Sequence, residues 1–192
     1  WRDPPSPSEP ADPVPTTVLI FTDRADVQPY FELLVGVEKP SVTGLYVRHG
    51  GGGTMFIDAS RRTQRIEKTS LHELVHDLLH QGEHKAPHCI EEGLAEYFGN
   101  GDIHDGKFVA GFPIPQHLKL VRNGPPMPLE EMFAVEPETH QSLAPVFYAQ
   151  SWAAVDWLMR MDRERFFPFL DEIEGGASGA EALRKHYGKE LR

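Results

Sequence analysis

The sequence predicts an α+β fold, and this prediction rests on the order of its hydrophobic patterns. Three short runs rich in β-branched and aromatic residues lie before residue 60, and such runs favour strands. After them, apolar residues recur mainly at helical spacing as far as the C-terminus. We therefore expect a small mixed sheet that packs on the first long helix, followed by a mainly helical part.

Six prolines in residues 1–15 set this segment apart from the rest of the chain. Proline supplies no amide hydrogen and fixes φ, so we expect a disordered tail or linker here. Residues 16–192 then have the length of a single domain. Because the chain begins with Trp1, we expect a processed or trimmed product.

The first elements of the domain are a strand and a helix. Residues 17–21, TVLIF, have the composition of a buried strand. A short helix is expected at residues 26–35, with Thr22 and Asp23 as candidate caps. Its inward-facing residues are expected to be Phe31, Leu34 and Val35.

Two further strands are expected at residues 43–48 and 54–58. The four glycines at residues 50–53 suit a hairpin turn between them, and His49 is expected on a surface loop. Residues 54–58 are a candidate sheet edge that could pair with an extended peptide.

A helix over residues 64–80 carries the pattern His-Glu-x-x-His. Its predicted core face consists of Leu71, Leu74, Val75, Leu78 and Leu79. His72 and His76 are four residues apart, so they share one face of the helix and can hold one zinc ion. Glu73 lies beside that face, where it can act as general base towards a water of lowered pKa. His80 lies one turn further along and is expected to be structural.

A catalytic zinc needs a third protein ligand and one open position. The downstream candidates are His84, His88, Glu91, Glu92, Glu96, His104, His117 and His140. A metal ligand is best held by a rigid element, which favours the helix expected at residues 90–98. In this helix Glu92 and Glu96 share a face. In this arrangement Glu92 is the third ligand, and Glu96 accepts the second ring N–H of a ligand histidine, most simply His72.

The remaining elements follow from turn signals and helical spacing. We expect a hairpin at residues 102–112, an irregular segment at 118–128, and helices at 129–133, 145–160, 163–174 and 179–187.

The string HELVH followed by EEGLAEYF resembles the gluzincins, metallopeptidases whose third ligand is a glutamate from a second helix. It is most similar to the short peptidase-MA-like domains of bacterial proteins known as DUF1570. In that family a proline and the string E-G-L-A-E-Y-F follow the motif helix, and a tyrosine-glutamine-serine helix comes later. The corresponding residues are Pro87, the string 92–98, and the string 148–152, YAQSW. The resemblance covers residues 17–170.

This resemblance implies a zincin-like fold and a zinc-dependent peptidase, which we expect to be an endopeptidase and a monomer. It also implies that Tyr148 stabilises the oxyanion of the tetrahedral intermediate, with Tyr46, His104 and His140 as weaker candidates. A bacterial, exported protein in the periplasm, at the cell surface or outside the cell is implied as well.

The chain departs from the family pattern in three places. Cys89 replaces a tryptophan, and only fifteen residues separate His76 from Glu92. The glycine-methionine-glutamate-asparagine motif of related aminopeptidases is missing, so aminopeptidase activity is not expected.

Composition excludes several other classes of function. The net charge of −10 opposes binding to nucleic acid or to anionic lipid. Cys89, the lone cysteine, cannot form an internal disulfide and is expected to be a small buried residue. No run is apolar and long enough to span a membrane. The alternatives left open are an inactive zinc-binding domain that binds peptides or proteins, and a general histidine-rich metal binder.

Overall fold

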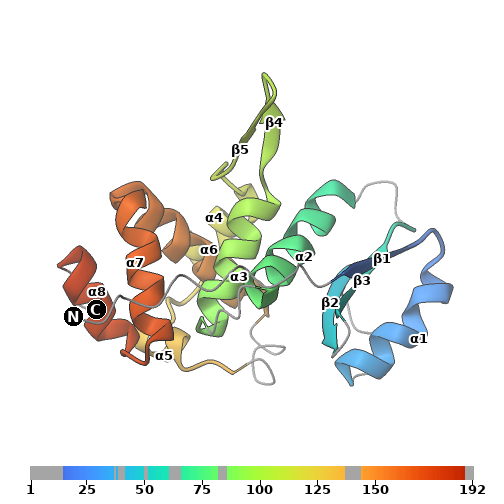
Figure 1. The fold of residues 1–192 in the computed structure, drawn as a ribbon, viewed down its shortest axis with the longest axis horizontal. Coiled ribbons are helices and arrows are strands. Elements are labelled where there is room, and N and C mark those ends of the chain that lie inside the picture. Colours follow the sequence, from blue (N-terminus) through green and yellow to red (C-terminus); the bar gives the residue numbers. More distant parts are fainter. Residues whose placement is uncertain are drawn as a thin grey trace, which may run out of the picture.

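The computed structural model describes residues 15–36, 38, 42–49, 52–60, 66–81, 86–136 and 144–188, and the structural statements below concern these residues. The fold is α+β, as predicted (Figure 1). Its elements are β1 (Thr16–Phe21), α1 (Arg24–Val35), β2 (Gly44–His49), β3 (Gly52–Asp58), α2 (Ile66–Gln81), α3 (His88–Gly99), β4 (Asp102–His104), β5 (Lys107–Val109), α4 (Pro115–Asn123), α5 (Leu129–Phe133), α6 (Ala144–Met161), α7 (Arg163–Glu174) and α8 (Gly179–Tyr187).

The sheet has the order β1-β3-β2, with β1 parallel and β2 antiparallel to the central strand β3. His49 pairs with Gly52, so β2 and β3 form the predicted hairpin and His49 ends a strand. The turn residues Gly50 and Gly51 lie outside the described residues. The expectation that residues 54–58 form a sheet edge is wrong, because β3 is paired on both sides.

Two helices cover opposite faces of this sheet (Figure 1). On one face, Val27 and Phe31 of α1 pack against Phe56 of β3. On the other face, α2 packs on β2 and β3. The motif helix is therefore fixed against the sheet, as predicted from the order of the elements.

The strand β1 departs from its predicted burial. Val18 and Ile20 are 50% and 57% exposed, although the run reads as a buried strand. The physical reason is that β1 is an edge strand, while α2 packs on β2 and β3. On α1, Asp23 caps the N-terminus as predicted and Phe31 is buried, but Leu34 is exposed.

The predicted core face of α2 is only partly correct. Val75 and Leu79 pack against the helical core, whereas Leu74 and Leu78 are exposed. The buried side chains of α2 are instead Glu73 and Asp77. Asp77 accepts hydrogen bonds from Thr16 Oγ1 at 2.7 Å and from Gln81 Nε2 at 2.9 Å. The face of α2 towards the sheet therefore carries a buried carboxylate at Asp77 that is satisfied by hydrogen bonds, which a hydrophobic pattern does not reveal.

The second core is formed mainly by α3, α6, α7 and α8. Cys89 is completely buried there, as expected. The helices α5 to α8 agree with their predicted ranges within one residue. At the α8 N-terminus, Ser178 and Glu181 form a capping box.

A hairpin and a helix between α3 and α5 complete the fold. The predicted hairpin is present as β4 and β5, with positive φ at Asp105 and Gly106, and it projects from the body in Figure 1. The expectation of an irregular segment at residues 118–128 is wrong over its first half, where α4 lies. Pro115 occupies the first turn of α4, a position where proline favours a helix.

The expected tail covers residues 1–15, and all of these except Pro15 lie outside the described residues. No helix in the described ranges has the length and apolar composition needed to cross a membrane.

Candidate metal centre

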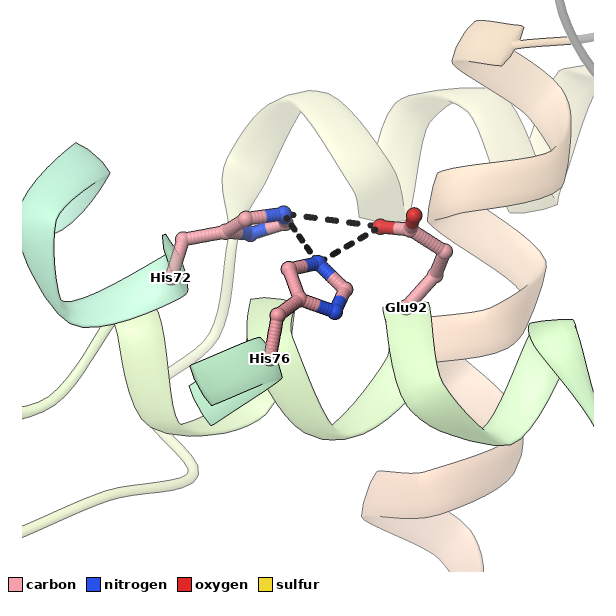
Figure 2. Close-up of side chains that lie close together, drawn as sticks. All are labelled: His72, His76 and Glu92. Atoms are coloured by element: carbon pink, nitrogen blue, oxygen red, sulfur yellow. Dashed lines mark hydrogen bonds and ion pairs between the residues drawn. The ribbon is translucent and has the colours of Figure 1, made fainter. Parts of the chain in front are cut away.

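Three side chains from two helices converge at the junction of α2 and α3 (Figure 2). Nε2 of His72 lies 3.3 Å from Nε2 of His76 and 3.4 Å from Oε2 of Glu92. Nε2 of His76 lies 3.7 Å from the same carboxylate oxygen. One donor atom from each residue therefore points to a common centre, the arrangement a single metal ion requires.

The two helices approach closely because of a glycine. A Cβ atom at Gly99, the last residue of α3, would lie 3.1–3.2 Å from the backbone and Cβ of His72. The i,i+4 spacing places both histidines on the face of α2 that meets α3. Glu92 lies one turn into α3 and completes the group.

Glu92 is the most constrained member of this group. It is 6% exposed, and its Oε2 atom is buried with no hydrogen-bond partner among the described residues. Its other oxygen, Oε1, lies 3.9 Å from Nε2 of His88. A buried carboxylate oxygen without a donor is costly, and a cation between it and the two imidazoles would remove that cost. The residues present thus suit a bound metal ion.

The charges of the group are strongly coupled. Burial opposes ionisation of Glu92, but the imidazoles of His72 and His76 outweigh burial and hold the pKa of Glu92 well below its usual range. Burial likewise lowers the pKa of His72, but the carboxylates of Glu92, Glu73 and Glu96 raise it to about 9. The site therefore concentrates negative charge, which favours a cation.

Glu73 lies on the side of α2 that faces β2. A Cβ atom at Gly44 would be 2.5 Å from Oε1 of Glu73, so only glycine leaves room for this carboxylate. Burial raises the pKa of Glu73, and the charge of Glu92 raises it further, against the opposing effect of His72 and His76. The carboxylate is buried beside both histidines without being one of the three converging groups.

Glu96 lies on the opposite side of His72. Its Oε1 is 3.6 Å from Nδ1 of His72, the ring nitrogen turned away from the common centre. Its Oε2 is 2.9 Å from Nε2 of His117, which α4 contributes. The structure thus places Glu96 beside His72, where the sequence reasoning expects it, and adds a third histidine to the contact.

Tyr148 of α6 lies at the edge of the group. Its ring centroid is 6.3 Å from that of His72, in an edge-on arrangement. Burial raises the pKa of Tyr148, and the nearby charges of Glu92, Glu73 and Glu96 raise it further. The phenol therefore keeps its proton and remains a hydrogen-bond donor in this environment.

The other candidate ligands lie elsewhere or have other contacts. His104 is on the exposed hairpin, and Glu91 is not among the converging groups. His80 stacks on Tyr46 with ring centroids 5.4 Å apart, which agrees with a structural role for His80. His84 and His140 lie outside the described residues.

Sequence reasoning missed the contact of His117 with Glu96, although it named both residues as possible ligands. The sequence predicts no helix around His117 and an irregular segment from residue 118, so nothing in the pattern indicates which way His117 faces. Only the packing of α4 on α6 brings it to α3.

Comparisons with models of protein families, with curated proteins and with solved structures find no match for this chain. Two imidazole nitrogens and one carboxylate oxygen form a donor set that could hold a metal ion.

Proposed function

We propose that this chain is a zinc-dependent metallopeptidase that cleaves peptide bonds as an endopeptidase. The observation that carries the proposal is the convergence of His72, His76 and Glu92, with the buried carboxylate of Glu73 next to both histidines. Three protein ligands of the nitrogen and oxygen type are the usual set of a catalytic zinc site that leaves one position open.

The donor types favour zinc over magnesium and calcium. Magnesium and calcium prefer oxygen-only sites, whereas two imidazoles and one carboxylate suit zinc. A zinc ion held by these three residues would polarise the scissile carbonyl and increase the acidity of water. Cys89 takes no part in this set, because burial in the helical core raises the pKa of its thiol to about 12.

Glu73 is proposed as the general base. Its carboxylate takes a proton from the attacking water and later delivers that proton to the leaving amine. The burial of this carboxylate between β2 and the histidines supports the assignment, because burial raises its pKa towards the range in which a carboxylate exchanges protons effectively.

Glu96 and Tyr148 are proposed in supporting roles. Oε1 of Glu96 lies 3.6 Å from Nδ1 of His72, where it is placed to take the Nδ1 hydrogen, and this would keep Nε2 of that ring available as a donor atom. Tyr148 donates its hydroxyl hydrogen to the oxygen that becomes negative during amide hydrolysis. One such donor contributes about 2.7–4 kcal/mol to the stability of the transition state.

The position of β2 supports a peptide as substrate. This strand is an edge of the sheet among the described residues, and it lies against α2 where Gly44 contacts Glu73. An extended peptide that adds to this edge would run past the general base. The substrate edge is therefore assigned to β2 and not to β3.

The variant Glu73→Gln tests the proposed function. We expect it to retain zinc and to lose about 10²–10⁴-fold in the rate of peptide cleavage, because the amide cannot accept the proton. The measurement is cleavage of a broad peptide panel with and without a chelator, together with zinc content. Glu67→Gln changes an exposed glutamate at the start of the same helix and should leave both readouts unchanged.

Near-normal cleavage by Glu73→Gln would contradict the proposed mechanism. If the wild-type chain binds zinc and the peptides but cleaves none of them, the alternative of an inactive peptide- or protein-binding domain is favoured instead.

A further inference from the structure

The contacts of Glu96 extend beyond the proposed metal centre. One oxygen of Glu96 lies 3.6 Å from Nδ1 of His72, and the other lies 2.9 Å from Nε2 of His117. The three residues come from α3, α2 and α4. We propose that His117 is a positioning residue of the metal centre, which holds the Glu96 carboxylate in the orientation that fixes His72. This inference rests on the proposed metal site and extends it to a third helix.

The short contact determines where the hydrogen lies. A carboxylate only accepts hydrogen bonds, so the hydrogen must be on Nε2 of His117. Oε2 of Glu96 is then held by a donor, and Oε1 remains directed at His72. Glu96 is 24% exposed at its side chain, and a glutamate of that exposure would otherwise sample several rotamers.

The surroundings of His117 support a role beyond packing. Its side chain is 14% exposed and lies beside Trp152, with ring centroids 5.8 Å apart. Its Nδ1 is buried and has no hydrogen-bond partner among the described residues. An apolar residue would fill such a place without that cost. The Glu96 contact is the polar interaction that the imidazole provides and an apolar side chain cannot.

The consequence for the metal is transmitted through the His72 ring. An acceptor at Nδ1 fixes the ring orientation and raises the basicity of Nε2, and loss of such partners typically costs 10–100-fold in metal affinity. Because His117 orients the acceptor, its loss should weaken metal binding even though it is not one of the three converging residues.

Two polar substitutions of His117 distinguish a role in positioning Glu96 from a role in packing alone. The amide of His117→Gln reaches the position of Nε2, whereas the amide of His117→Asn reaches only that of Nδ1. Zinc affinity is measured by competition with a chromophoric chelator at one pH. We expect about 10–100-fold weaker binding for His117→Asn and a change within a few-fold for His117→Gln. His104→Asn on the exposed hairpin is the control and should bind zinc like the wild type.

A double-variant cycle shows whether the effect passes through Glu96. In a Glu96→Ala background, His117→Asn should cause no further loss of affinity. Equal affinity of the Asn variant and the wild type would overturn the inference, as would a full additional loss in the Glu96→Ala background. Equal losses in the Asn and Gln variants would also overturn it, because they would indicate packing alone.

Failure of the inference and failure of the proposed site are distinguishable. A wild-type chain that binds no zinc would overturn both. A wild type that binds one zinc ion, with unchanged affinity in His117→Asn, would overturn only the role of His117. Thermal unfolding of each metal-free variant confirms that the compared chains are folded.

Discussion

At the scale of single residues, the site depends on where three carboxylates are buried. Glu92 faces the two histidines, Glu73 lies against Gly44, and Asp77 accepts hydrogen bonds from Thr16 and Gln81. Burial of a charged group is costly unless partners compensate it. Asp77 has its partners within the protein, whereas Oε2 of Glu92 has no hydrogen-bond partner among the described residues, which is why a metal ion is proposed there.

Gly44→Ala tests the position of Glu73. The added Cβ would lie 2.5 Å from Oε1 of Glu73 and 2.5 Å from Cγ2 of Thr69, so the carboxylate must move. A displacement of about 1 Å can cost about 10²-fold in rate. We therefore expect a loss of peptide cleavage of that order with zinc retained, measured by kinetics and metal content.

Gly175→Ala is the control for this variant, because its φ of −71° suits alanine and its nearest contact, at 3.3 Å, is much less severe than the 2.5 Å contacts at Gly44. If Gly44→Ala cleaves peptides at the wild-type rate, Glu73 is not positioned through its contact with β2.

The ionisation of Asp58 predicts how the stability of the folded state depends on pH. Burial raises its pKa, but hydrogen bonds from Ser60 and the Arg24 guanidinium outweigh burial and lower it. A depressed pKa means that ionised Asp58 stabilises the folded state above its unfolded pKa of about 3.9. That stability is lost as the pH falls through the lower, folded-state pKa.

We expect Asp58→Asn to cost about 1.5–3 kcal/mol at neutral pH, because Arg24 Nη1 loses a charged partner at 2.9 Å. The difference from wild type should shrink below about pH 4. Denaturant unfolding between pH 2 and 7 measures it. A difference that stays constant over this range would show that the charge of Asp58 is not the stabilising feature.

At the scale of elements, α3 is the helix that unites the site. It packs against α2 on one side and α6 on the other (Figure 1). Gly99 permits the close approach to His72, and Gly93 permits the close approach to Ser151 and Val155 of α6. These glycines occur at the two contacts where a side chain would separate the helices.

Gly93→Ala tests this packing. The new Cβ would lie 2.4 Å from the backbone oxygen of Ser151 and 2.6 Å from Cγ2 of Val155. Alanine favours a helix over glycine by about 1 kcal/mol, but overpacking costs about 1–3 kcal/mol. We expect net destabilisation, measured by denaturant unfolding of the metal-free chain. Unchanged or increased stability would contradict the close α3–α6 contact.

Most elements could be predicted from local patterns, and the errors have a common cause. Strands, caps and the later helices follow from propensity and turn residues close in sequence. The exposure of β1, the edges of the sheet and the polar face of α2 depend on which elements pack together. The helix α4 begins at Pro115, and proline in the first turn of a helix favours helix initiation, a local signal that the expected irregular segment at residues 118–128 leaves out.

At the scale of the whole molecule, the proposed site lies where two parts of the fold meet. The sheet and its helices contribute His72, His76 and Glu73 through α2, and the helical core contributes Glu92 and Glu96 through α3. The spacing of the two histidines is a local property, so the sequence reveals it directly. The contact between His117 and Glu96 is a property of the tertiary structure, so the sequence alone did not reveal it.

The most direct test of the central claim is the metal content of the purified chain, combined with X-ray absorption of the bound ion. We predict one zinc ion per chain, with two nitrogen donors and one carboxylate oxygen at about 2.0–2.2 Å. The ion should be lost or greatly weakened in Glu92→Ala. A chain that binds no zinc, or binds it equally well without Glu92, would contradict the claim.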